Sequence, residues 1–303
     1  MGIARNAEPP VVVGVAEYDA APIVRAAARQ ARDLGAGLIL LHAVNWSAPP
    51  GTTTSPEAIA EVVLAPWADM VRAEFPGVEV VLRPVAASPA GALLEASRGA
   101  ALLVVGHRAR HRPARLNPGS VSMALAGRTH CPLEVVHPEQ ADRPAPADSV
   151  PARPVVVAAA SGEQPEDEVV LEYAFAEARR RGAALDVVHA ARHPQVLTPP
   201  LAPEGQRSRD GIAAQAARTL GARLGPLRAA FPDVPARVDV ELGSPARALL
   251  AAAEHAELVV TGAHGRGALG RLAAGSVSSD VLHRAPCTVV VVPLAQEGAD
   301  TAA

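Results

Sequence analysis

The sequence predicts an α/β protein built from two tandem doubly wound domains, each a five-stranded parallel sheet of order 3-2-1-4-5 with helices on both faces. Short runs of Val and Leu alternate with alanine-rich stretches of helical length, which is the pattern of successive βαβ units. The plan occurs twice, because a glycine-rich motif of the first half returns 156 residues later. Apolar residues form 49% of the 303 residues and aromatic residues only 2%, so Ala, Val and Leu must fill the cores.

The first half contains five expected strands separated by four expected helices. Gly35 marks the end of the first helix, because glycine readily adopts the left-handed conformation that closes a helix. Pro56 fits the first turn of the second helix, and Ser88 fits the N-cap of the third. Strands that alternate with helices favour a parallel sheet with right-handed crossovers. In chain order the elements are strand 11–15, helix 23–34, strand 38–44, helix 55–75, strand 78–82, helix 89–98, strand 102–105, helix 120–126 and strand 133–136.

The second half repeats these nine elements, and the repeat defines the domain limits. We expect an N-terminal arm at 1–9, a first domain at 10–137, a linker at 138–153, a second domain at 154–294 and a C-terminal tail at 295–303. The linker holds four prolines and no periodic apolar pattern. The elements are strand 155–157, helix 169–181, strand 185–188, helix 212–231, strand 238–242, helix 245–254, strand 258–260, helix 277–283 and strand 288–292.

Charge and composition exclude several classes of protein. The net charge of -3 argues against a general nucleic-acid binder, which usually carries a basic excess. No apolar stretch reaches the roughly 18 residues that span a bilayer, so we expect a soluble protein with no membrane partner, and the pattern of its two cysteines favours a reduced, cytoplasmic protein. Cys131 and Cys287 have no C-x-x-C partner, and no Cys/His cluster occurs. Neither a disulfide framework nor a metal site built by the protein is therefore expected.

The most informative motif lies between strand 258–260 and helix 277–283. It reads Gly262-Ala263-His264-Gly265, nine residues, then Gly275-Ser276-Val277-Ser278. Glycine allows close approach of a ligand to the backbone, and the first N–H groups of the following helix have no intrahelical partners. The motif therefore predicts a phosphate-binding loop. The first half carries a weaker copy, in which Gly106 and Gly119 are kept and Ala109 replaces the second glycine.

This glycine pattern, followed by Pro286-Cys287 and then by the valine-rich last strand, resembles that of the universal stress protein family. The match covers both halves, so the chain resembles a tandem member. The resemblance implies ATP as cofactor, with any Mg²⁺ held by its phosphates and water. It also implies that the last strands, 133–136 and 288–292, pair between the domains as a pseudo-dimer or between two chains as a homodimer. The implied nucleotide ligands in the second half are Gly262, Gly265, Gly275, Ser276 and Val277, with Arg266 as a phosphate candidate, and those in the first half are Gly106, Gly119, Ser120 and Val121.

Two departures from the family pattern keep a second function open. Nucleotide-binding members carry aspartate after the first strand, where Ala16 and Ala160 stand here, and valine after the histidine of the second strand, where Ala43 and Ala190 stand. The leading hypothesis is a regulatory stress protein that binds an adenine nucleotide in its second half. The alternative is a nucleotide-free dimeric stress protein that acts as an interaction module.

Simpler interpretations apply to several of the same residues. The serines Ser276 and Ser120 are either helix N-caps alone or caps that also contact phosphate. His42 and His189 end equivalent strands, which favours structural histidines over ligands. The segment 265–270 spells G-x-G-x-x-G, but its place in the last third of the domain disfavours a dinucleotide fold. Neither Ser276 nor Ser120 lies in a G-x-S-x-G elbow, and no general base can be named, so we expect no catalytic residue.

Overall fold

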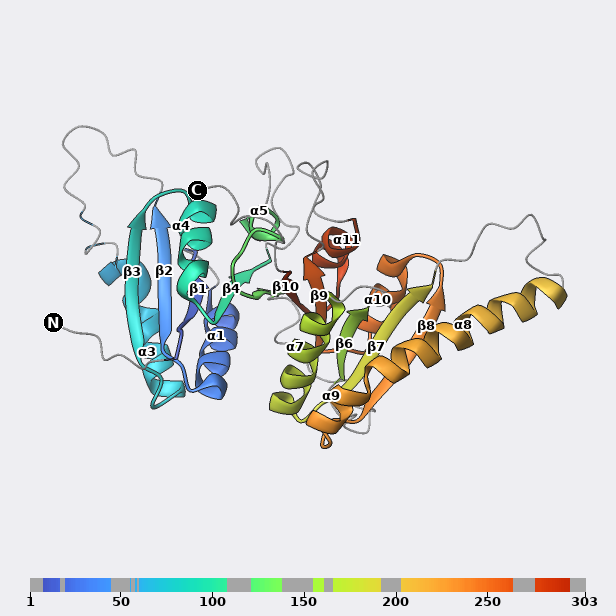
Figure 1. Ribbon diagram of the computed structural model, residues 1–303. Helices are drawn as coiled ribbons and strands as arrows, with labels where there is room; N and C mark the ends of the chain where they lie inside the picture. Colours follow the sequence, from blue (N-terminus) through green and yellow to red (C-terminus); the bar gives the residue numbers. More distant parts are fainter. Residues whose placement is uncertain are drawn as a thin grey trace, which may run out of the picture. The chain divides into compact units, whose positions relative to one another are not determined.

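The computed structural model describes residues 8–16, 20–44, 60–107, 121–137, 155–160, 166–191, 203–263 and 276–294, together with positions 55 and 58. The chain divides into two compact units, residues 1–143 (unit 1) and 144–303 (unit 2). Figure 1 labels the helices and strands of both units. Across the described residues, no helix is both long enough and apolar enough to cross a membrane.

Unit 1 is a doubly wound α/β domain. Its described strands form a parallel sheet in the order β3-β2-β1-β4-β5, as predicted. The strands are β1 (Val11–Gly14), β2 (Leu38–Val44), β3 (Val80–Ala86), β4 (Leu102–Gly106) and β5 (Leu133–Val136), and the helices are α1 (Ala21–Leu34), α3 (Ala65–Glu74), α4 (Pro89–Ala96) and α5 (Val121–Leu125), with a π-helical turn at Ala60–Leu64 and a 3-10 turn at Ser97–Gly99.

Unit 2 has the same architecture. Its described strands are parallel and follow the order β8-β7-β6-β9-β10, which confirms the predicted fold class for both halves. The strands are β6 (Val155–Ala160), β7 (Ala184–Ala191), β8 (Ala236–Leu242), β9 (Leu258–Ala263) and β10 (Thr288–Pro293), and the helices are α7 (Glu166–Arg181), α8 (Pro203–Arg223), α9 (Gly225–Ala230), α10 (Pro245–Ala253) and α11 (Ser276–Arg284).

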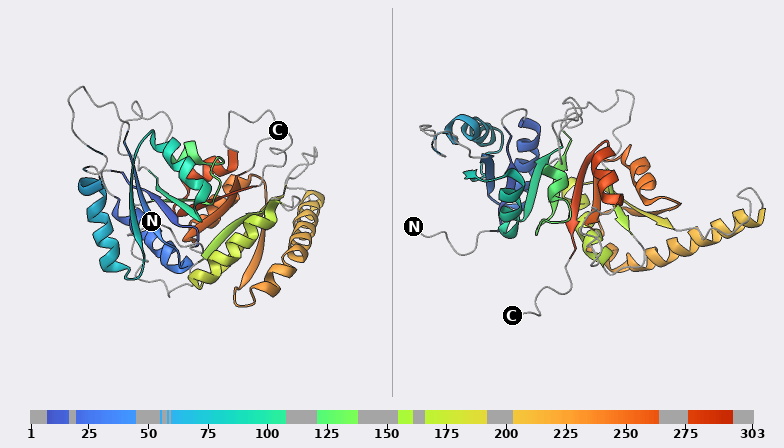
Figure 2. Two further views of the ribbon diagram at one scale, coloured as in Figure 1. Left: turned by 60° about the vertical axis from the view of Figure 1, so that its left-hand side comes forward. Right: turned by 90° about the horizontal axis from the view of Figure 1, so that it is seen from above.

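Helices cover both faces of each sheet. In unit 1, α1 and α3 pack on one face and α4 and α5 on the other, and in unit 2, α7 and α8 lie opposite α10 and α11 (Figure 2). The cores are aliphatic: Val13, Leu40 and Val104 meet Ala27 and Ala28 of α1. Small alanines on the helices allow close approach to the sheet, so a core can form with few aromatic residues.

Local signals placed most helix ends, and the differences have local causes. Gly35 closes α1 with φ 64°, and the Ser88 hydroxyl accepts a hydrogen bond from the Gly91 amide at 3.3 Å, as predicted. The helix predicted at 212–231 begins earlier, at Pro203, and breaks before α9. Pro226 explains the break, because proline has no N–H to continue the ladder. Strand β3 runs to Ala86 through Pro84, which an edge strand tolerates. Pro56 lies outside the described residues.

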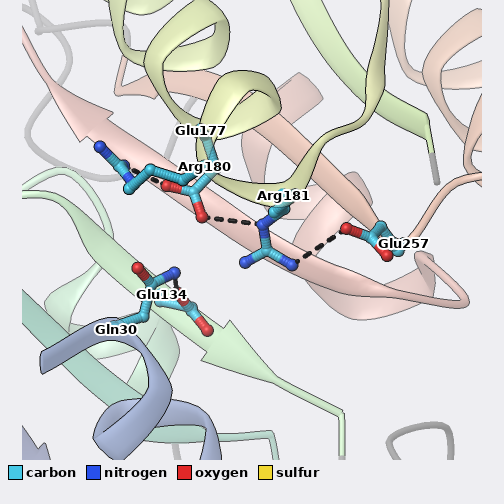
Figure 3. Close-up of polar contacts among 6 residues, drawn as sticks. All are labelled: Gln30, Glu134, Glu177, Arg180, Arg181 and Glu257. Atoms are coloured by element: carbon cyan, nitrogen blue, oxygen red, sulfur yellow. Dashed lines mark hydrogen bonds and ion pairs between the residues drawn. The ribbon is translucent and has the colours of Figure 1, made fainter. Parts of the chain in front are cut away.

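The two units place different polar groups at one buried position. Gln30 and Glu177 each lie five residues before the glycine that follows their helix. In unit 1 the Gln30 amide donates to the Glu134 carboxylate on β5 at 2.9 Å. In unit 2 the Glu177 carboxylate, 1% exposed, lies between two guanidinium groups of its own helix, those of Arg180 and Arg181 (Figure 3). The shared fold therefore does not dictate the chemistry at this position.

Candidate functional site

The candidate site of unit 2 lies at the carboxyl ends of its central strands. β6 and β9 are neighbours, but their register covers only Val156↔Leu258 to Ala158↔Val260. Both strands continue past this register, β6 to Ala160 and β9 to Ala263. The strand that follows β6 in the chain, β7, lies on one side of this central pair, and the strand that follows β9, β10, lies on the other. Open α/β sheets bind ligands at such a switch point.

Helix α11 begins at this edge of the sheet. Ser276 is its first residue and Val277 its second, and the helix is nine residues long. The Ser278 hydroxyl, in the first turn, donates to the carbonyl of Gly262 at 3.0 Å, so the helix start is tied to the end of β9. The first N–H groups of a helix lack intrahelical acceptors and carry partial positive charge. This end of α11 is therefore suited to an anion.

The first glycine of each motif has a packing role that sequence reasoning missed. A Cβ on Gly262 would lie 3.1 Å from Val170 Cγ2 and 3.2 Å from Leu294 Cδ1. A Cβ on Gly106 would overlap the end of the Ile23 side chain on α1. Neither glycine is among those with positive φ in the described residues. The packing of α1 and α7 on the strands thus accounts for these two glycines.

The structure describes only part of the predicted ligand set. Gly262 is the last residue but one of β9, Val277 lies half-buried in the first turn of α11, and the backbone of Ser276 starts that helix. In unit 1, Gly106 ends β4 and Val121 starts α5, which has five residues. The predicted ligands that lie outside the described residues are Gly265, Arg266, Gly275, Gly119 and Ser120.

The second-strand histidines are structural, as predicted. His42 Nδ1 lies 2.8 Å from the Val15 carbonyl oxygen, and His189 Nδ1 lies 2.9 Å from that of Ala160. A carbonyl can only accept, so Nδ1 carries the proton in both rings. Each histidine thereby ties the end of the first strand of its unit to the second.

These two hydrogen bonds correct the alignment of the two units at the end of their first strands. Because His42 bonds Val15 and His189 bonds Ala160, Ala160 is the counterpart of Val15. The strand registers agree, since Val11 and Val156 face the equivalent residues Leu102 and Leu258. Ala16 and Ala160 are therefore not equivalent, so the prediction that both stand at the family's aspartate position cannot hold for both. The counterpart of Ala16 is Ser161, which lies outside the described residues.

Unit 1 has a histidine pair where unit 2 has none. The rings of His107 and His137, which follow β4 and β5, lie 4.5 Å apart between centroids and are tilted by 31°. Ala263 and Pro293 occupy the corresponding places in unit 2. Thirty positions separate the two histidines, so only the pairing of β4 with β5 brings them together.

Neither cysteine contributes to the candidate site. Cys131 and Cys287 are free, are buried and precede β5 and β10, at the end of the strands away from the site. Burial raises the pKa of each thiol to about 12. Within the described ranges, no group of three or more His, Cys, Asp or Glu side chains could hold a metal ion.

We expect both thiols to resist alkylation in the native protein. At pH 8 a thiol whose pKa is near 12 is about a thousandfold less ionised than an ordinary cysteine, and the thiolate is the reactive form. Iodoacetamide labelling followed by intact-mass measurement should therefore proceed at least about 100-fold faster in urea than in buffer. Native labelling within about tenfold of the rate in urea would contradict the burial of these side chains.

Comparison with known proteins identifies the same pattern in both units. Residues 9–137 and 152–293 each match the sequence model described as the universal stress protein family. A universal stress protein of Mycobacterium bovis is 36% identical over 207 residues, which cover 68% of this chain and 66% of that protein. A universal stress protein of Mycolicibacterium smegmatis is 35% identical over 296 residues, which cover 93% of this chain and 96% of the relative. The crystal structure of a universal stress protein from Archaeoglobus fulgidus resembles the fold with a TM-score of 0.63 at 18% identity, over 96% of this chain and 98% of that chain.

Proposed function

The chain belongs to the universal stress protein family, whose domain it carries twice, and on that basis we propose that it is a regulatory stress protein that binds ATP in unit 2. The observation that carries this proposal is the position of α11. Its first turn lies at the carboxyl edge of the sheet and is tied to the end of β9. A phosphate chain at this edge would meet the free amides of that turn, which stabilise negative charge.

The proposed ligands divide by chemistry. The backbone amides of Ser276 and Val277 would donate to phosphate oxygens, while Gly265 and Gly275 would let the backbone approach them. Arg266 would add a positive charge that matches phosphate geometry. Mg²⁺ would accompany the nucleotide, held by its phosphates and water.

Unit 1 is the weaker candidate for the same ligand. Its corresponding helix, α5, has five residues against nine in α11. Ala109 replaces the second motif glycine, and at a positive φ its Cβ would cost about 1 kcal/mol. We therefore propose one ATP per chain, with Gly106, Gly119, Ser120 and Val121 as the residual site of unit 1.

The proposed role is regulatory and cytoplasmic. ATP occupancy of unit 2 would serve as the signal, and no side chain of the candidate site is assigned as a general base. Pairing of the last strands, β5 and β10, within one chain or between two chains remains part of the proposal.

A second candidate function follows from the base end of the site. Ala190 of unit 2, like Ala16 and Ala43 of unit 1, stands where nucleotide-binding relatives were expected to carry aspartate or valine, so each unit offers fewer contacts to a base. These alanines favour a nucleotide-free interaction module that works through its last strands. The position of α11 supports nucleotide binding and does not support this second function.

The experiment begins with mass spectrometry of small molecules released from gently purified protein, followed by calorimetric titration of ATP into the stripped sample. We expect about one ATP per chain. Gly275→Val should weaken binding at least about 30-fold, or about 2 kcal/mol, because a side chain blocks approach to the backbone.

Gly119→Val, at the same motif position of unit 1, is the matched control and should leave the affinity of unit 2 unchanged. Unaltered affinity in Gly275→Val would refute the assigned ligands. If the parent protein binds no ATP at millimolar concentration, the interaction module is the better function.

A further inference from the structure

Ser278 connects the two ends of the proposed phosphate loop. It is the third residue of α11 and is 5% exposed. Its hydroxyl donates to the carbonyl oxygen of Gly262, 16 positions earlier, at 3.0 Å. Gly262 lies in β9, one residue before that strand ends. This one hydrogen bond therefore joins the two ends of the segment that connects β9 to α11.

The topology of the sheet explains why the Gly262 carbonyl needs this donor. Backbone groups of successive residues in a strand point alternately to the two neighbouring strands. In unit 1 the His107 amide donates to Val136 on β5, so the backbone of Gly106, one residue earlier, points toward β1. By the same alternation, the backbone N–H and C=O groups of Gly262 point toward β6.

On that side the pairing of β6 with β9 ends at Ala158↔Val260, before Gly262 is reached. Gly262 is nevertheless buried, and a buried carbonyl without a donor is costly. Ser278 supplies the donor at 3.0 Å, whereas the Thr261 hydroxyl lies 3.5 Å from the same oxygen. The contact therefore replaces a missing strand neighbour.

We infer that Ser278 is a positioning residue for the nucleotide, acting through the backbone and not by touching it. By fixing the first turn of α11 against the end of β9, it sets the direction of the free amides before ATP arrives. Ordering a loop during binding costs free energy, and a contact that is already made removes part of that cost. The inference rests on the proposed function, since it names the residue that prepares that site.

The test uses the full chain and three variants. Ser278→Ala removes the donor, Ser278→Thr keeps the hydroxyl, and Ser279→Ala removes a half-buried hydroxyl from the same turn as the control. We expect Ser278→Ala to raise the Kd for ATP about tenfold, equivalent to about 1.4 kcal/mol. Ser278→Thr and Ser279→Ala should stay within about threefold of the parent.

Amide hydrogen exchange without ATP tests the contact independently. Peptides that cover α11 should exchange about tenfold faster in Ser278→Ala than in Ser279→Ala, because the helix start is no longer held. An unchanged Kd in Ser278→Ala, or an equal loss in Ser278→Thr, would overturn the inference.

If the parent protein binds no ATP, the proposed function fails and the exchange rates alone decide the matter. Faster exchange in Ser278→Ala would then support Ser278 as the contact that holds the loop ends. Equal rates in both alanine variants would overturn it.

Discussion

Replacement of Glu177 by alanine should lower the free energy of unfolding by about 3 kcal/mol. The Glu177 carboxylate is 1% exposed and accepts from Arg180 and from Arg181 Nε, the latter at 2.8 Å. Removal of one partner from a buried ion pair leaves the other charges uncompensated, which costs about 3–5 kcal/mol. The lower end applies here, because Arg180 and Arg181 keep 24% and 26% of their side-chain exposure and Arg181 also pairs with Glu257 at 3.3 Å.

Urea unfolding followed by circular dichroism measures this loss. Glu172→Ala, on the exposed side of the same helix, is the matched control and should change stability by no more than about 0.5 kcal/mol. Glu177→Gln separates charge from shape, since glutamine stands at the equivalent position of unit 1. A loss below about 1 kcal/mol in Glu177→Ala would mean that the two arginines are well solvated without their partner.

Phe175→Ala should destabilise unit 2 by about 3–5 kcal/mol. Phe175 is fully buried in the core between α7 and the sheet, and its ring lies 5.5 Å from that of Phe231. Its neighbours on α7 include Ala174 and Ala178, whose short side chains cannot move to fill the space. The cavity would therefore persist, and its cost adds to the lost transfer free energy of the ring.

The same urea titration tests whether the loss of stability comes from the cavity. Phe175→Leu keeps most of the volume and should cost less than about 1.5 kcal/mol. Val169→Ala is a suitable control, because Val169 lies on the same helix and is 50% exposed. If Phe175→Ala and Phe175→Leu lose equal stability, the neighbouring residues collapse around the site and the packing argument fails.

Much of the fold could be predicted because its signals are local. Alternating Val-rich and Ala-rich segments indicated the elements, and Gly35 and Ser88 marked helix ends through their own backbone preferences. Element boundaries were less accurate where the sequence carries no apolar period that marks them. The early start of α8 at Pro203 is an example, because the residues that precede Ile212 carry no clear apolar period.

The candidate site was predictable to a lesser degree. The motif correctly located a helix start after the fourth strand of each unit, since the glycine and serine spacing is itself a local signal. The packing of Gly262 against Val170 and Leu294 could not be inferred, because those side chains are distant in the chain. The partner of Ser278 was missed for the same reason.

The α/β class, the twofold repeat, the aliphatic cores and the position of the glycine motif could all be inferred from the amino-acid sequence. These features depend on composition and on periods of a few residues, which need no knowledge of distant contacts. Contacts between distant residues came only from the fold: Ser278 meets Gly262, His107 meets His137, and Ala160 proves to be the counterpart of Val15. Such pairs follow from strand register and helix packing, and a shift of one residue in either would replace every partner.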